Sequence, residues 1–458
     1  MHFTNQPHEA LYYQKFIIIF LLFNCFFCYS QKRNFDYSPR NNDSIESYIK
    51  AISQKKIQKF QGRHQKEITQ IIEERRVDFL KSIKDSTYIF DKKINSYLNS
   101  ILRQIYISNP QIDKKDFYFF INKSPIPNAA CYGNGIFTIN LGLFNIIESD
   151  DELAFIICHE IAHYILEHND KSLLGYVETY NSKENKKKIN KASNNRYGRR
   201  QAVSALVKDL SYNFLRRSRT AETQADSLGF VLLSKTKFNK SAGIKALKKL
   251  DMSNEIFFAT DTQIRKHFDF ETYPFKEVWL NKDETLFDLK EKADDFALDK
   301  DSLKTHPDMP IRVKELEKFY STENAISPSL DLKEIKNIVA ERSIDIFIDI
   351  SRIDLALYQV LTLHNNNQIE ETAYCNTVVD ILKKTYDLKS SHRFGKYVSP
   401  VSPFSDEKYL NEVRTFLHNI ELKNIRKIGL QFCMKYEKQM AQNPDFIKTT
   451  AFFYKLNP

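Results

Sequence analysis

Glycine and cysteine are both scarce in this chain, and each shortage argues against a class of protein. Only 10 of the 458 residues are glycine. An all-β sandwich or barrel needs many tight turns, so this scarcity favours helices. Six cysteines occur, and the four that follow residue 30 are scattered without a short pairing. Their spacing therefore argues against the disulfide framework that is typical of a small secreted domain.

Long apolar runs are also missing, with one exception near the N-terminus. Residues 16–28 (FIIIFLLFNCFFC) follow Lys15 and precede Ser30, which gives the charged start, apolar stretch and small cleavage-site residue of a signal peptide over residues 1–30. The run is shorter than the roughly 20 residues of a membrane span, although an uncleaved anchor is an alternative. We therefore expect an exported protein, periplasmic or secreted, without an integral span in the mature chain. Peripheral attachment to the membrane is left open.

Positive charge is in excess, but no nucleic-acid motif accompanies it. Lysine and arginine number 68 against 58 acids, which gives a formal net charge of +10. Such a balance can attract nucleic acid or anionic membranes, and it equally describes a lysine-rich solvated surface. Because no such motif accompanies the charge, we expect no nucleic-acid partner. The apolar and charged fractions, 42% and 28%, are ordinary for a soluble globular protein.

Helical periodicity dominates the pattern along the chain. Apolar residues recur at helical spacing over 44–105 and again after 325, whereas residues 344–350 fit either a helix or a strand. Strand character is limited to residues 117–121 and 135–141, which are rich in aromatic and β-branched residues. The predicted fold class is α+β and mostly α, with a small β-sheet. The C-terminal region is predicted to be all-α, either as helical repeats or as a plain bundle.

The middle of the chain combines predicted helices with irregular segments. A helix is expected from Ser149 to about His168, because a capping residue precedes three acids and an apolar run. Residues 169–200 are polar and basic and predict an inserted, mobile loop. Another helix is expected over 201–234. Residues 255–300 predict either a lid over a site or an ordinary surface excursion.

The most informative segment is His159-Glu160-Ile161-Ala162-His163. On a helix, residues four apart share a face, so both imidazoles can reach one metal ion. Glu160 can then take a proton from a water bound to that metal. The alternative is a helix with two hydrogen-bonded histidines. Apolar residues on both sides indicate burial, and two buried histidines beside a buried glutamate are hard to explain without a metal.

A third ligand is expected on a second helix. A catalytic zinc site needs three protein ligands and an open position. Glu222 and Asp226 are also four residues apart. Glu222 is therefore predicted to bind the metal, and Asp226 to orient a ligand histidine from behind. Arg219, one turn earlier, could neutralise these acids. Alone, this spacing is weak evidence, because acidic residues are common on helix surfaces.

These blocks together resemble a known family. His159 to His163, followed by Ser218 to Gly229 (SRTAETQADSLG), is similar to the HtpX and CAAX prenyl protease family of zinc metallopeptidases. Two further blocks agree: residues 128–143, and Thr305-His306-Pro307 with Arg312 five residues later. The resemblance covers roughly residues 90–320, with four blocks in the family's order.

The resemblance implies a gluzincin catalytic domain that is mostly helical with a small sheet and holds one zinc ion per chain. It implies that an edge strand binds the substrate as an added β-strand. We expect that strand at Tyr132, Gly133, Asn134, Gly135 and Ile136. His306 is expected either to gate the zinc site or steady the oxyanion, or only to cap a loop. His168 also fits the family pattern and is interpreted as a packing residue.

The resemblance also suggests a domain organisation. Membrane-embedded members carry several membrane spans, whereas we expect none in the mature form of this chain. The chain therefore resembles instead the exported soluble branch, which adds a C-terminal helical region. We expect an N-terminal linker with helices over 31–89, a zinc metallopeptidase domain over 90–324 and the helical region over 325–458. Polypeptide substrates would bind the metallopeptidase domain, and envelope assembly proteins could bind the C-terminal helices.

The predicted function is zinc-dependent endopeptidase activity on extended or unfolded polypeptides in the cell envelope, in protein quality control. Zinc and Glu160 would activate water, and Glu160 would pass the proton to the leaving amine. The alternative is a chaperone or assembly factor for envelope proteins, with a latent protease site. That hypothesis rests on the C-terminal helices and on the predicted lid.

Overall fold

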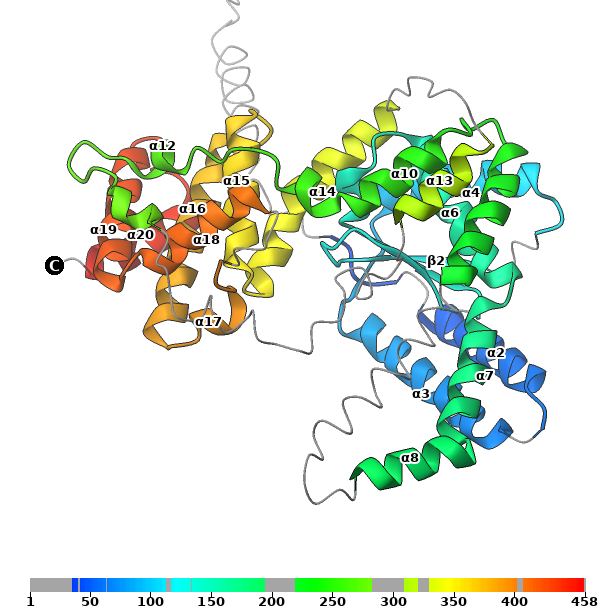
Figure 1. The fold of residues 1–458 in the computed structure, drawn as a ribbon. Coiled ribbons are helices and arrows are strands. Elements are labelled where there is room, and N and C mark those ends of the chain that lie inside the picture. Colours follow the sequence, from blue (N-terminus) through cyan, green and yellow to red (C-terminus); the bar gives the residue numbers. More distant parts are fainter. Residues whose placement is uncertain are drawn as a thin grey trace, which may run out of the picture. The chain divides into compact units, whose positions relative to one another are not determined.

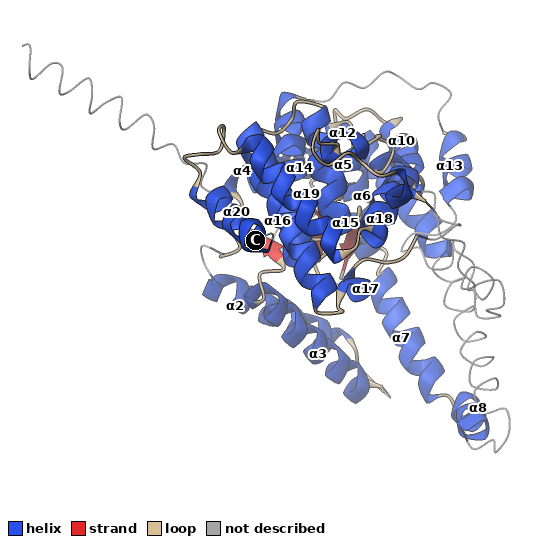
Figure 2. Ribbon diagram, turned by 90° about the vertical axis from the view of Figure 1, so that its left-hand side faces the viewer, coloured by secondary structure: helices blue, strands red, loops and turns tan. Residues whose placement is uncertain are grey.

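The computed structural model describes residues 35–39, 42–62, 64–112, 117–132, 134–193, 219–281, 309–319, 329–401 and 407–456 (Figure 1). The predicted signal peptide at 1–30 lies outside these ranges. Among the described residues helices predominate and the strands form one small sheet, which confirms the α+β, mostly α prediction (Figure 2). None of the described helices combines the length and apolar content that crossing a bilayer requires.

The elements fall into two stretches of chain. Those up to α13 are α2 (Asn42–Lys59), α3 (Gln65–Lys84), β1 (Tyr88–Ile89), α4 (Lys92–Ser108), β2 (Tyr118–Asn122), β3 (Ala129–Cys131), β4 (Ile136–Asn140), α5 (Leu143–Ile146), α6 (Asp150–Ile165), α7 (His168–Asn181), α8 (Lys183–Ser193), helical residues 219–234, α10 (Ala242–Asp251), α11 (Ser253–Phe257), α12 (Ile264–Phe268), the 3-10 helix η2 (Glu277–Leu280) and α13 (Met309–Glu317). Those that follow are α14 (Leu330–Asp349), α15 (Ile353–Asn365), α16 (Glu371–Ser390), α17 (Phe394–Tyr397), α18 (Lys408–Asn419), α19 (Leu422–Tyr436) and α20 (Pro444–Leu456).

The sheet has the order β1-β2-β4-β3. The two predicted strands are β2 and β4, and they pair in parallel, with Tyr118 opposite Ile136 and Asn122 opposite Asn140. β3 lies between them in sequence and pairs antiparallel to β4, so it forms one edge of the sheet. Because side chains alternate along a strand, the sheet has two buried faces. One packs on α4 and α6, and the other packs on α2 and α3.

Helix α6 crosses the centre of the first core. Ser149 caps its N-terminus, since its hydroxyl accepts from the backbone N–H of Glu152 at 3.2 Å. All residues from Glu152 to His163 are buried, which is the pattern of a core helix. The helix ends at Ile165, slightly before the predicted end, because Glu167 adopts a left-handed backbone with φ 58°. This turn starts α7 in a new direction.

The prediction of a mobile loop over 169–200 is wrong for the described part. Helices α7 and α8 occupy residues 168–193, and residues 194–200 lie outside the description. Leu173 and Val177, one turn apart, pack on Ile68 and Ile72 of α3. The polar composition concealed this narrow apolar contact. Of the helix predicted over 201–234, the structure describes residues 219–234 as helical.

Residues 255–281, the described part of the segment expected to be either a lid or a surface excursion, contribute to a hydrophobic core. Phe258, Ile264, Phe268 and Trp279 are buried in a second hydrophobic core, which the C-terminal helices build. Residues 282–300 lie outside the description. The high aromatic content of the described part explains the result, because large rings are most stable when buried.

Helix α14 belongs to both cores. Leu332, Ile335 and Val339 pack into the first core, and Ile344 and Phe347 into the second. The segment 344–350, ambiguous in sequence, is therefore almost entirely helical. Every described element after residue 329 is a helix, as predicted.

Candidate metal centre

Two histidines of α6 face the same point. His159 and His163 are one turn apart and both buried, and their Nε2 atoms lie 3.0 Å apart. At this separation one imidazole nitrogen can donate to the other. With both rings neutral and both lone pairs turned inward, the same two nitrogens can instead face one cation.

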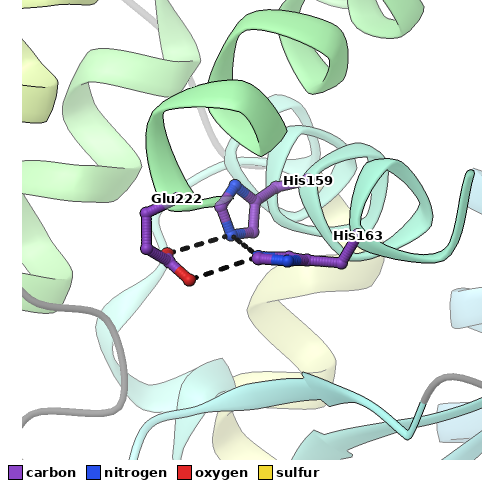
Figure 3. Close-up of side chains that lie close together, drawn as sticks. All are labelled: His159, His163 and Glu222. Carbon is purple, nitrogen blue, oxygen red and sulfur yellow. Dashed lines mark hydrogen bonds and ion pairs between the residues drawn. The ribbon is translucent and has the colours of Figure 1, made fainter. Parts of the chain in front are cut away.

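Glu222 completes a group of three with His159 and His163, and it belongs to the helical residues 219–234. Its carboxylate oxygens lie 3.5 Å from Nε2 of His159 and 3.3 Å from Nε2 of His163. One ligand atom from each of the three residues lies within 4.8 Å of the others. Figure 3 shows both imidazoles projecting from one helix toward the Glu222 carboxylate on another.

Gly229 allows this helix to come so close to α6. A Cβ atom at this position would lie 2.9 Å from Cα of His159 and 3.0 Å from its backbone nitrogen. Backbone atoms cannot move aside as a flexible side chain can, so any larger residue would push the helices apart. Glu222 lies two turns before Gly229, and the close crossing brings its carboxylate over the imidazoles.

Behind the three residues lies a buried ion pair. Asp226 accepts from Nδ1 of His159 at 2.9 Å. Arg312, only 2% exposed, donates to both oxygens of Asp226 at 2.6 Å and lies 2.9 Å from Oε2 of Glu222. One guanidinium thus holds both acids of the second helix. Asp226 thus lies behind His159, where a carboxylate orients a metal-ligating histidine in known sites, and that role stays a prediction for this chain.

The acids shift the protonation of His159. Burial alone would lower the pKa of His159, but the Asp226 and Glu222 carboxylates outweigh it and raise that pKa to about 10. Burial likewise works to raise the pKa of Asp226, whereas Arg312 and His159 hold it below the usual range. In the metal-free chain His159 is therefore protonated at neutral pH, and a metal ion would displace this proton.

The family model of peptidase family M48 matches residues 92–320, which is half of the chain. The chain belongs to peptidase family M48. The match confirms the resemblance at the level of the metallopeptidase family, and it covers the two histidines, Glu222 and Arg312. Comparison with curated proteins gave no match.

The M48 assignment gives Glu160 a chemical context. Metallopeptidases of this kind are metal-dependent hydrolases, and the motif places an acid next to the first ligand. Glu160 is 3% exposed and lines a small cavity together with His159, Arg312 and Asn128. The cavity reaches the edge strand, because Ala129 also lines it. Glu160, His159 of the ligand cluster and Ala129 of the edge strand therefore border one space.

The edge strand lies earlier than the sequence predicted. Tyr132, Asn134 and Gly135 lie in the turn between β3 and β4, and Ile136 belongs to β4, which has a neighbour on each side. The edge is β3, residues Ala129–Cys131. Strand order cannot be read from one sequence, and the short Ala-Ala-Cys segment has little β-propensity. Gly133 lies outside the described residues.

Other predicted site residues have different outcomes. His306 lies outside the described residues, so its role stays a prediction. Arg219 lies at the start of the described helix, where the hydroxyl of Thr223 donates to its carbonyl at 3.2 Å. Arg312, which the sequence marked only as part of the Thr-His-Pro block, pairs with both Asp226 and Glu222, and the role of Arg219 stays a prediction.

The M48 site has a donor set that fits a zinc ion. Two imidazole nitrogens and one carboxylate oxygen are the ligands of many catalytic zinc sites. Each ligand histidine also has a partner for its outer nitrogen: Asp226 for His159 and His168 for His163. His159, His163 and Glu222 would therefore hold the metal.

Proposed function

We propose that the chain is a zinc-dependent endopeptidase that cleaves extended or unfolded polypeptides in the cell envelope, where it acts in protein quality control. Family membership supports the general activity of a metallopeptidase. The observation that carries the finer proposal is the meeting of three features at one cavity. These are His159 of the ligand cluster, the buried acid Glu160 and the edge strand β3 at Ala129.

The residues of the chain divide the chemistry between them. Bound zinc supplies a Lewis acid that lowers the pKa of water and polarises a peptide carbonyl. Glu160 accepts the proton of the attacking water and delivers it to the leaving amine. Asp226 keeps His159 oriented through Nδ1, and Arg312 keeps Asp226 and Glu222 in place.

Strand β3 supports an extended substrate. The backbone N–H of Tyr132 donates to the carbonyl of Ile136, and the N–H of Asn140 donates to the carbonyl of Asn128. Hydrogen-bonded and non-bonded pairs alternate in an antiparallel ladder, so Ala130 is the residue of β3 whose backbone groups face β4. Ala129 and Cys131 therefore direct their N–H and C=O groups away from β4, on the side where Asn169 of α7 donates to the Cys131 carbonyl at 2.8 Å. A substrate strand added there binds through its backbone and needs no particular side chains. Only an unfolded segment presents its backbone in this way.

The purified chain is expected to cut reduced, unfolded casein at internal bonds and to leave a stably folded protein intact. Mass spectrometry of the products locates the cleaved bonds. Chelation should abolish cleavage, and added zinc should restore it. Products shortened only from one terminus would contradict the endopeptidase assignment, and equal cleavage of the folded protein would contradict the requirement for an extended substrate.

The second core favours a second candidate, a chaperone or assembly factor with a latent protease site. Its helices after residue 329 lie beyond the family match and could bind client proteins. Deleting them is a poor test, because α14 also packs into the first core. The full chain carrying Glu160→Gln is a better one. Strong suppression of client aggregation by this variant, with no cleavage by the wild type, would favour the chaperone.

A further inference from the structure

The turn between α6 and α7 carries a histidine that the mechanism above does not use. His168 is the first residue of α7, and its Nδ1 lies 2.9 Å from Nδ1 of His163. The other nitrogen of His168, Nε2, lies 3.0 Å from Oε1 of Gln224. Hydrogen bonds therefore connect three side chains, His163, His168 and Gln224, and Gln224 lies on the helix that carries Glu222.

The amide oxygen at the end of this chain fixes where the protons lie. An amide oxygen accepts and cannot donate, so Nε2 of His168 carries a proton. In a neutral ring the other nitrogen is then an acceptor, so Nδ1 of His168 accepts from Nδ1–H of His163. His163 consequently keeps its lone pair on Nε2, which lies 3.3 Å from Glu222. This is the tautomer that a metal ligand needs.

The two ligand histidines have chemically different partners. Asp226, a carboxylate, orients His159, whereas the neutral ring of His168 orients His163. The site already contains Glu222 and Asp226, and Glu160 lines the cavity beside them. A neutral acceptor orients His163 without adding another negative charge to a buried site, where an unbalanced charge is costly.

Several contacts hold the turn that presents His168. Asn169 donates from Nδ2 to the carbonyl of Cys131 on β3 at 2.8 Å. Asp170, largely buried, pairs with Lys56 and with Lys59 of α2, each at 2.8 Å. Helix α2 lies outside the family match, so a part of the chain beyond the matched residues contributes to holding the turn. The position of His168 is therefore set before any metal binds.

We propose that His168 is a positioning residue of the metal centre. It fixes the tautomer and ring orientation of His163, and Gln224 in turn fixes the tautomer and ring orientation of His168. The proposal rests on the proposed function only in that His163 must bind a metal. Partners of this kind typically contribute 10–100-fold to metal affinity or activity. This proposal is the alternative to the interpretation of His168 as a packing residue.

The test measures the zinc affinity of the full chain by competition with a chelating dye, together with the visible spectrum of the cobalt-loaded protein. His168→Phe keeps a ring but removes the acceptor, so its dissociation constant for zinc should rise about 10–100-fold. His168→Asn places an amide oxygen near the lost Nδ1 and should recover most of the affinity. Gln224→Leu frees the tautomer of His168 without altering the turn, and should weaken zinc binding less than His168→Phe.

His392→Asn is the matched control, since His392 is an exposed histidine in the turn between α16 and α17 and its replacement should have no effect. Wild-type zinc affinity and an unchanged cobalt spectrum in His168→Phe would overturn the proposal. Equal weakness of His168→Asn and His168→Phe would also overturn it, because packing alone would then explain the loss. If His168→Phe fails to fold, Gln224→Leu decides, and a wild-type affinity there counts against the proposal. A wild-type chain that binds no zinc would overturn the metal centre itself.

Discussion

Replacing Glu160 by glutamine is expected to lower the rate of peptide cleavage by about 10²–10⁴-fold while bound zinc stays at the wild-type level. Glutamine has nearly the size of glutamate, so it fits the buried position, where Glu160 is 3% exposed. It cannot accept a proton from water or deliver one to the leaving amine. The three ligand atoms belong to other residues, so metal binding does not depend on Glu160.

Casein cleavage and zinc content measured on the same preparations check this prediction. Glu178→Gln makes the same chemical change on the exposed surface of α7 and should retain full activity. More than about a tenth of wild-type cleavage in zinc-loaded Glu160→Gln would be incompatible with a general base that contributes the usual 10²–10⁴-fold. Another group would then have to take the proton.

Replacing Arg312 by methionine is expected to destabilise the metal-free chain by about 3–5 kcal/mol. Arg312 is 2% exposed and is shared by Glu222 and Asp226. Methionine fills much of the space but leaves two buried carboxylates without this cation. A zinc ion at Glu222 supplies positive charge in the same place, so the difference from wild type should shrink when zinc is added.

Denaturant unfolding with and without zinc measures both effects. Arg265→Met is the matched control, because Arg265 is about half exposed and pairs with Glu277 and Glu412 at the surface. Its loss should cost no more than about 1 kcal/mol. The account is contradicted if the two variants lose the same stability, or if zinc leaves the effect of Arg312→Met unchanged.

The sequence predicted the ligand cluster because its geometry is local. His159 and His163 share a face of any helix, and so do Glu222 and Asp226. The prediction needed only that the two helices meet, and Gly229 permits that meeting. The strands β2 and β4 were likewise predictable from their aromatic and β-branched residues.

The supporting contacts were not predictable, because they depend on how distant elements meet. Arg312 reaches Asp226 from 86 residues away in the chain. His168 meets His163 only because Glu167 adopts a left-handed backbone, which favours glycine or asparagine rather than glutamate. The edge strand was misplaced for the same reason, since strand order is a property of the whole sheet.

The helices α7 and α8 show a different limit. Their sequence is mostly polar, and only Leu173 and Val177 anchor α7 to α3 in the apolar cluster. Two apolar residues are too few for a periodicity argument, although ion pairs of Glu167 and Asp170 with α2 hold the same helix. Polar composition therefore indicated exposure correctly, but exposure was wrongly equated with a loop.

The central claim is that His159, His163 and Glu222 hold a catalytic zinc ion, and diffraction at the zinc absorption edge tests it most directly. Crystals of the zinc-loaded chain are expected to show one anomalous peak, with both Nε2 atoms and a Glu222 oxygen each about 2.0–2.2 Å away. A peak at these three residues would establish the centre on which the proposed activity depends. A peak elsewhere, or none there at full zinc occupancy, would contradict it.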